Sequence, residues 1–72
     1  MRYAIVIEHG EHNLSAYVPD LPRCVATGGT VDELTKNMAE AIEFHIDGLG
    51  GRGEAVPEPT SLVEYVEVKP GA

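Results

Sequence analysis

The sequence predicts an α+β fold in which three strands are followed by one helix and a fourth strand. Three observations support this prediction. Residues 2–27 alternate β-forming stretches with turn residues. A Thr-x-x-Glu pattern at residues 30–33 opens a stretch with apolar residues at helical spacing. Residues 61–68, SLVEYVEV, are again rich in β-branched and aromatic side chains.

The first part of the chain contains the three predicted meander strands. Residues 2–9, RYAIVIEH, are apolar on both faces of an extended chain, which predicts a central strand. Glycine and asparagine within residues 10–13 permit a hairpin turn, after which residues 14–18 return as the second strand. Two prolines within residues 19–22 remove ladder donors and stiffen the next loop. Residues 23–27 then form a short third strand.

The predicted helix covers residues 31–47 and begins at a capping box, Thr30-x-x-Glu33. Two acidic residues in its first turn complement the positive end of the helix dipole. Glycines and prolines then predict a loop of about a dozen residues before the last strand, residues 61–68. Residues 70–72 are expected to form a flexible tail. The stripe that would pack on the sheet is Leu34, Met38, Ala41, Ile42 and Leu49, with His45 between them.

The element order also predicts a topology. Crossovers between parallel strands are right-handed in nearly all cases. If the last strand lies beside the first, the two are parallel, and the result is a four-stranded mixed sheet in the order 3-2-1-4 with the helix on one face. The third and fourth strands are then edges, and Glu64 and Glu67 discourage pairing at the fourth. We therefore expect the third strand or the helix-free face to form a symmetric homo-oligomer.

Size and cysteine content limit the possible classes of protein. A chain of 72 residues allows one domain, here residues 1–69, and its single cysteine excludes an internal disulfide and a zinc site built from paired cysteines. No apolar run is long enough to span a bilayer. We expect a cytoplasmic protein without membrane contact and without a cofactor.

Charge is the strongest compositional signal. The chain has 12 Asp and Glu against 5 Lys and Arg, which gives a formal net charge of −7. Such a surface repels phosphate backbones, and the few cations are scattered singly, so direct nucleic-acid binding is not expected. Two interpretations stay open: the charge keeps the protein in solution, or it attracts a basic partner.

Residues 16–34, AYVPDLPRCVATGGTVDEL, contain a Val-Pro-Asp-Leu-Pro loop, a short strand and a Gly-Thr-x-x-Glu helix start. In this order they resemble the HicB antitoxin-like pattern, and the resemblance covers nearly the whole chain. It implies a truncated ribonuclease H-like sheet. It also implies a protein-binding role, because HicB antitoxins hold HicA, a small basic RNA-cleaving toxin, in an inactive complex. Arg23 departs from the pattern, in which glycine is usual near this position.

The resemblance has a further implication for DNA binding. Typical members of the family continue into a C-terminal DNA-binding segment that represses their own operon. This sequence ends at Ala72, so direct operator binding is not expected.

Two groups of residues are candidates for partner contact. Glu40, Glu43 and Asp47 recur on one face of the predicted helix with no cation four residues on to neutralise them. Phe44 lies among them and would supply an apolar anchor. The alternatives are a solvated face and a phenylalanine packed on the glycine-rich loop. The second group is Asp20 and Leu21 in the proline-bounded loop, chosen for charge and expected exposure.

A second hypothesis is a small oligomeric domain that binds a ligand or a metal and has no toxin partner. His9 and His12 flank the hairpin turn and, with Glu8 or Glu11, could supply three metal ligands. Histidines at a solvated turn are also common without any such role. Enzymatic activity is not expected, because a ribonuclease H-like nuclease needs a carboxylate in the middle of its first strand to bind metal, and only Glu8, at the strand end, is acidic.

Overall fold

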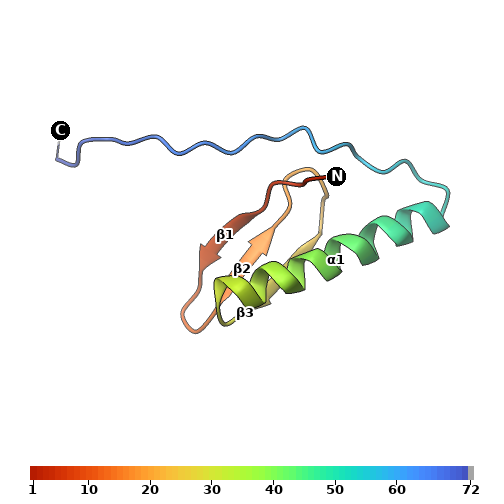
Figure 1. The fold of residues 1–72 in the computed structure, drawn as a ribbon, viewed down its shortest axis with the longest axis horizontal. Coiled ribbons are helices and arrows are strands. Elements are labelled where there is room, and N and C mark those ends of the chain that lie inside the picture. Colours follow the sequence, from red (N-terminus) through yellow and green to blue (C-terminus); the bar gives the residue numbers. More distant parts are fainter. Residues whose placement is uncertain (72) are drawn as a thin grey trace.

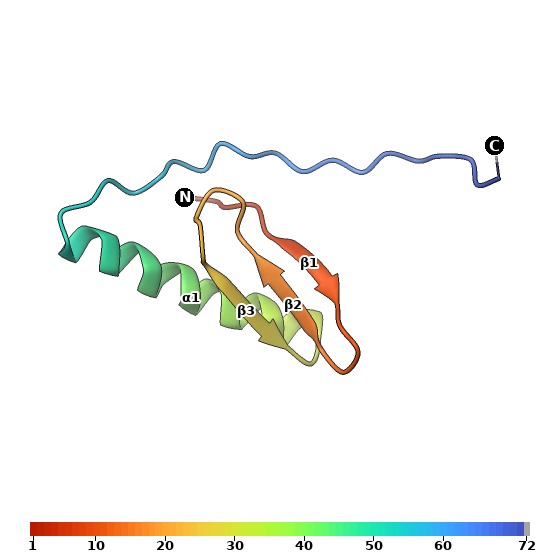
Figure 2. The same ribbon diagram turned by 180° about the vertical axis from the view of Figure 1, so that it is seen from behind.

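The structure is a computed structural model and describes residues 1–71. Three antiparallel strands form one sheet in the order β1-β2-β3, and one helix packs against it (Figures 1 and 2). This confirms the predicted α+β class and the three-strand meander that precedes the helix. The elements are β1 (Val6–His9), β2 (Leu14–Tyr17), β3 (Val25–Gly28) and α1 (Val31–Gly51).

Tight turns fix the register of the meander. The first hairpin closes with a hydrogen bond of 2.8 Å from the Gly10 N–H to the Asn13 carbonyl, which places His9 opposite Leu14. The loop after β2 is held by two backbone hydrogen bonds between Leu21 and its neighbours, as donor to Val18 at 3.1 Å and as acceptor from Cys24 at 3.2 Å. The stiff loop predicted from the two prolines is therefore a compact, hydrogen-bonded turn.

The helix begins as the capping box predicts. The Thr30 hydroxyl accepts a hydrogen bond of 3.1 Å from the Glu33 N–H, which satisfies one of the free donors of the first turn. The helix start also lies very close to the end of β3: a Cβ built on Gly28 would come within 2.7 Å of the Leu34 nitrogen. Farther along α1, the Asn37 side-chain amide donates to the Thr27 carbonyl at 2.8 Å. Backbone and side chain thus tie α1 to β3.

The core lies between α1 and the β2–β3 part of the sheet. The helix contacts β3 most extensively and β2 to a lesser extent, and it has no contact with β1. Partly buried side chains from the N-terminal segment and the helix surround this centre. The buried apolar side chains are Ala16, Val18, Leu21, Cys24, Leu34 and Met38.

Two predicted boundaries were wrong. The helix continues past residue 47 to Gly51, and the Arg52 N–H still bonds back to the Gly48 carbonyl at 3.2 Å. Each glycine costs about 1 kcal/mol relative to alanine within a helix, but here the backbone hydrogen bonds continue to form. The first strand was also predicted too long, because the ladder begins at Val6 and residues 2–5 remain outside it.

The predicted fourth strand is not present in the described chain. Residues 61–68 run extended but pair with no strand, so the sheet of residues 1–71 has three strands rather than the predicted four in the order 3-2-1-4. After α1 the chain turns back, passes the N-terminus and continues beyond the sheet (Figures 1 and 2). Of the predicted tail, residues 70 and 71 form a turn, and residue 72 lies outside the described residues. Composition favoured a strand, but β-forming residues make one only where an edge lies alongside them.

Candidate partner-binding surface

Three carboxylates and one aromatic ring share an exposed face of α1. Glu40, Glu43 and Asp47 are all exposed, and Phe44 between them is 82% exposed. Their spacing places them on neighbouring helical turns of one side. Within residues 1–71 the single ion pair joins Arg52 to Glu54, so these three carboxylates have no cationic partner. We call Glu40, Glu43, Phe44 and Asp47 the acidic face.

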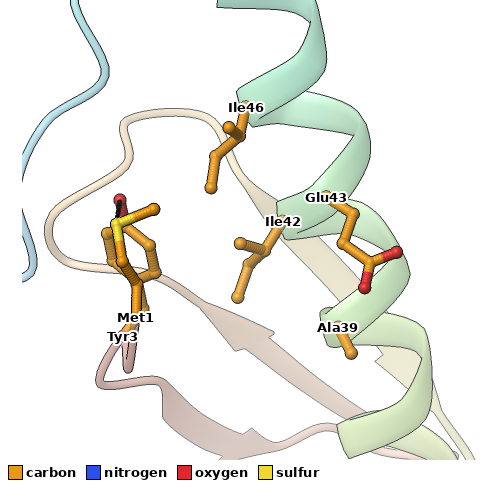
Figure 3. Close-up of a pocket in the computed structure, with 6 residues that line it drawn as sticks. All are labelled: Met1, Tyr3, Ala39, Ile42, Glu43 and Ile46. Atoms are coloured by element: carbon orange, nitrogen blue, oxygen red, sulfur yellow. Dashed lines mark hydrogen bonds between the residues drawn. The ribbon is translucent and has the colours of Figure 1, made fainter.

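An apolar pocket adjoins the acidic face. Its volume is about 340 Å³ and it lies between α1 and the N-terminal segment. Figure 3 shows Ile42 and Ile46 pointing from the helix toward Met1 and Tyr3, while the carboxylate of Glu43 lies at the rim and turns away from Met1. Glu43 therefore belongs to both the acidic face and the pocket wall. The lining residues are Met1, Tyr3, Ala39, Ile42, Glu43 and Ile46.

The pocket exists because α1 leaves the first strand uncovered. The helix packs on β3 and β2 but not on β1, and Ile42, which packs against the core, also lines the pocket. The N-terminal segment before β1 supplies the opposite wall. Sequence reasoning missed Met1, Tyr3, Ala39 and Ile46. A weak signal was present in Ala39 and Ile46, which lie at helical spacing from Ile42 of the main stripe, but nothing local indicated the N-terminal wall.

The predicted contact residues of the loop have other positions. Leu21 is fully buried in the core, so its expected exposure was wrong and it does not belong to the accessible surface. The carboxylate of Asp20 accepts hydrogen bonds from the Ser61 N–H at 3.0 Å, the Ser61 hydroxyl at 2.8 Å and the Thr60 hydroxyl at 3.2 Å. The bonds from Ser61 and Thr60 favour the ionised form and lower the pKa of Asp20. Asp20 thus fastens the C-terminal part of the chain.

The metal candidates do not form a site in the described chain. His9 and His12 are both exposed at the hairpin, as are Glu8 and Glu11. Among residues 1–71, no group of three histidine, cysteine or acidic side chains is arranged to hold a metal ion. Cys24 is buried, and burial raises the pKa of its thiol, which lowers its reactivity. No helix of residues 1–71 has the length and apolar content needed to cross a bilayer.

Three curated relatives have sequences similar to this chain. An uncharacterised 14.9 kDa protein of the rep–hol intergenic region of Haemophilus phage HP1 is 36% identical over 92% of this chain. The matched region is half the length of the phage protein. A UPF0150 protein of Helicobacter pylori is 41% identical over 61% of each chain. A UPF0150 protein of Synechocystis is 28% identical over 92% of this chain and 85% of its own length.

A solved structure and a sequence profile also resemble this chain. A chain in the solved structure of the HicA3 and HicB3 toxin-antitoxin complex superposes with a TM-score of 0.73 and 32% identity, over 82% of this chain and 69% of that one. The sequence profile described as "HicB_like antitoxin of bacterial toxin-antitoxin system" matches residues 3–71. The chain therefore belongs to the HicB-like antitoxin family of bacterial toxin–antitoxin systems.

Proposed function

We propose that this chain neutralises a small basic RNA-cleaving toxin of the HicA type by covering the surface with which that toxin binds RNA. The observation that carries the proposal is the position of Glu43, which lines the apolar pocket and also belongs to the acidic face. A partner that inserts an apolar side chain into the pocket would thereby bring flanking cations against unpaired carboxylates.

The charge of the acidic face suits such a partner. A protein that binds RNA uses lysine and arginine to contact phosphates. Carboxylates at Glu40, Glu43 and Asp47 compete for the same cations, and the formal net charge of −7 attracts them from a distance. Complementary charge mainly accelerates association and sets orientation. Ionic strength should therefore affect the association rate more than the dissociation rate.

Apolar contacts would provide much of the affinity. Phe44 is 82% exposed, and no core contact explains an aromatic ring at this position. Buried aromatic anchors are common energetic centres of protein interfaces. The pocket lined by Ile42 and Ile46 gives the partner a second apolar contact on the same flank of α1. The proposed interface therefore combines an anchor on each chain with a charged rim.

The support from the comparisons is of two kinds. Membership in the HicB-like family supports an antitoxin role. The superposed chain comes from a complex that contains a toxin and an antitoxin, which supports a HicA-like partner here. Occlusion as the mechanism, and the acidic face as the contact surface, are the parts we propose.

The test is a binding and RNA-cleavage assay with a purified basic HicA-like toxin from the same genome. The variant is Glu40→Lys, Glu43→Lys and Asp47→Lys. The control reverses three exposed carboxylates elsewhere to lysine, Glu8, Glu11 and Glu67, and has the same net charge. We expect the variant to raise the Kd by about 100-fold or more, equivalent to about 3 kcal/mol, and to lose inhibition of cleavage.

The control separates local contact from overall charge. It should raise the Kd by less than about fivefold, because distant exposed charges are largely screened at physiological salt. If both variants bound the toxin equally weakly, net charge alone would explain the effect. The acidic face would then not be the contact surface. A toxin that stays inhibited by the first variant would also contradict it.

A further inference from the structure

A second pocket lies at the C-terminal end of α1, where the chain turns back after the helix (Figure 1). Its volume is about 310 Å³, and its walls come from the loop after β2, the last turns of α1 and the segment that follows the helix. Two of the five Lys and Arg of this acidic chain line it, together with one histidine. We call it the cationic pocket, and these residues are Arg23, His45 and Arg52.

Hydrogen bonds hold the walls of the cationic pocket in place. The Tyr3 hydroxyl donates to the Pro57 carbonyl at 2.7 Å, which fixes the wall formed by the chain after the helix. The loop that contains Arg23 is closed by the backbone hydrogen bond of 3.2 Å from the Cys24 N–H to the Leu21 carbonyl. The helix wall includes His45, which is partly buried. The pocket is therefore largely preformed, as ligand sites usually are.

The backbone of Arg23 has an unusual conformation. Its φ is 69°, and it is the single residue other than glycine with a positive φ in the part of the chain that the structure describes. Side chains crowd their own backbone in this region, so glycine usually occupies such positions. Within residues 1–71 the ion pair joins Arg52 to Glu54, so the Arg23 guanidinium pairs with no carboxylate there. A strained residue with an unpaired charge in a pocket wall is typical of ligand sites.

The helix end opposes an anion only weakly. Carbonyls at the C-terminus of a helix carry partial negative charge, but the following backbone satisfies them here. The Gly53 N–H donates to the Gly50 carbonyl at 3.1 Å, and the Glu54 N–H donates to the Leu49 carbonyl at 2.9 Å. The Arg52 guanidinium also donates to both carboxylate oxygens of Glu54 at 3.3 Å. Because Arg52 neutralises Glu54, the charge of Arg23 remains available to a ligand.

We propose that the cationic pocket binds a small phosphate monoester with an apolar body. The guanidinium group suits phosphate because its N–H donors meet two oxygens at once. Arg23 would supply the first contact, and Arg52 would supply a second by exchanging the Glu54 carboxylate for the ligand. His45 adds a further donor on the helix wall.

The remaining walls and the size of the pocket define the body of the ligand. The other lining side chains are apolar, which suits a ring or a short hydrocarbon next to the phosphate. The volume of about 310 Å³ admits a metabolite-sized molecule and leaves no room for a polymer. The net charge of −7 repels any anion from a distance, so we expect a Kd no tighter than about 0.1 mM. The apolar lining residues are Pro22, Leu49, Ala55 and Pro57.

The test is an NMR titration of the full chain with phenyl phosphate at about pH 7.5, where the phosphate carries nearly two negative charges. We expect saturable shifts of the amides of Arg23, His45 and Arg52 with a Kd of about 0.1 to 1 mM. Inorganic phosphate lacks the ring and benzoate lacks the phosphate, so each should bind at least about fivefold more weakly. Phenol should not saturate at about 10 mM.

Three variants identify the residues responsible. Arg23→Gly should weaken phenyl phosphate binding by about tenfold or more, because a charged hydrogen-bond donor is lost. The same change at an exposed arginine outside the pocket, Arg2→Gly, should weaken it less than about twofold. Glu54→Gln should tighten binding about two- to fivefold, because it removes a competing carboxylate. The urea midpoint of Arg23→Gly should be unchanged or higher, since glycine adopts a positive φ without strain.

Several outcomes would overturn this proposal. Unchanged affinity of Arg23→Gly, shifts confined to other parts of the chain, or the absence of saturation would each exclude the cationic pocket as the site. Equal affinities for benzoate and phenyl phosphate would exclude selection of a phosphate. A lower urea midpoint for Arg23→Gly would assign Arg23 to folding rather than binding. None of these measurements involves the toxin or the acidic face, so their failure leaves the proposed function untouched.

Discussion

The Asp20 carboxylate accepts two hydrogen bonds from Ser61, one from the backbone N–H at 3.0 Å and one from the hydroxyl at 2.8 Å. The two residues are 41 positions apart. This pair fastens the chain after α1 to the turn between β2 and β3. The same loop buries Leu21 in the core, so the path of the C-terminal part depends on a loop that is itself well packed.

Replacing Asp20 by Asn should release residues 57–61. The substitution keeps the size of the side chain but removes the charge that makes the bonds from Ser61 and Thr60 strong. Hydrogen exchange at the Ser61 amide should accelerate by about tenfold or more. Asp32→Asn, which makes the same chemical change in the first turn of α1, should leave Ser61 unaffected. Unchanged exchange in the Asp20 variant would mean that other contacts hold this segment.

Acid should detach the same segment. The pKa of Asp20 is lowered by its bonds to Ser61 and Thr60, so the stabilisation is complete above the pKa of an unfolded aspartate and disappears as pH falls through the lower folded value. Attachment should persist at pH 5 and fail only below about pH 4. An NMR titration of the Asp20 carboxylate and the Ser61 amide would follow both events. Release in the range of histidine titration would contradict this assignment.

Alkaline conditions should act on the other fastening, the bond from Tyr3 to Pro57. The pKa of Tyr3 is raised because surrounding atoms exclude water and because Glu58 and Asp20 are negative. The neutral phenol is the donor, so its contribution is complete below the ordinary tyrosine pKa of about 10 and is lost as pH rises through the higher folded value. Ultraviolet titration should show one late phenol, which Tyr3→Phe removes. Its persistence in that variant would assign it to another tyrosine.

Gly28→Ala should destabilise the fold. The added Cβ would come within 2.7 Å of the Leu34 nitrogen and 2.8 Å of its Cα, both of which are backbone atoms that cannot rotate away. Separating β3 from α1 should cost about 1 to 3 kcal/mol in urea unfolding. Gly50→Ala is the matched control: its Cβ meets nothing within 4 Å, and it should stabilise the helix by up to about 1 kcal/mol. Equal changes in the free energy of unfolding for the two substitutions would show that the backbone around Gly28 and Leu34 shifts at little cost.

Substitutions at Leu34 and Phe44 should affect folding stability and toxin binding differently. Leu34 is fully buried and Phe44 is 82% exposed. Leu34→Ala should lower the free energy of unfolding by about 2 to 5 kcal/mol, whereas Phe44→Ser should change it by less than about 0.5 kcal/mol. Phe44→Ser should nevertheless weaken toxin binding by about tenfold or more. A marked loss of stability for Phe44→Ser would indicate that the ring packs on the protein's own chain.

Local signals predicted much of the fold. The capping box identified the start of α1 to the residue, because the Thr30 hydroxyl and the Glu33 N–H interact within one turn. The meander followed from β-forming stretches and turn residues. The end of the helix was less predictable: glycine weakens a helix, but the glycines after residue 47 remain helical because each continues the backbone hydrogen bonding.

Long-range features were harder to predict. Leu21 is flanked by an acidic residue and a proline, which suggested exposure, yet the turn folds it into the core. Met1 and Tyr3 form one wall of the apolar pocket, opposite the helix. Their position there depends on α1 covering β2 and β3 but not β1. The exposure of the acidic face could be predicted from helical spacing, because charged residues on the outer side of a helix are exposed without any tertiary contact. Whether residues 61–68 form a strand depends on an edge, and composition does not say which edge.

The bond from Asn37 to Thr27 has a consequence for solubility. Sheets with two receptive edges can stack side by side without limit, which is the route to fibrous aggregates. Here the amide of Asn37 occupies an acceptor on β3, and α1 packs over the same strand. The β3 edge therefore offers one acceptor fewer to a neighbouring strand, so edge pairing is favoured at β1. Unequal edges favour association at one side of the sheet and so lower the tendency to form extended stacks.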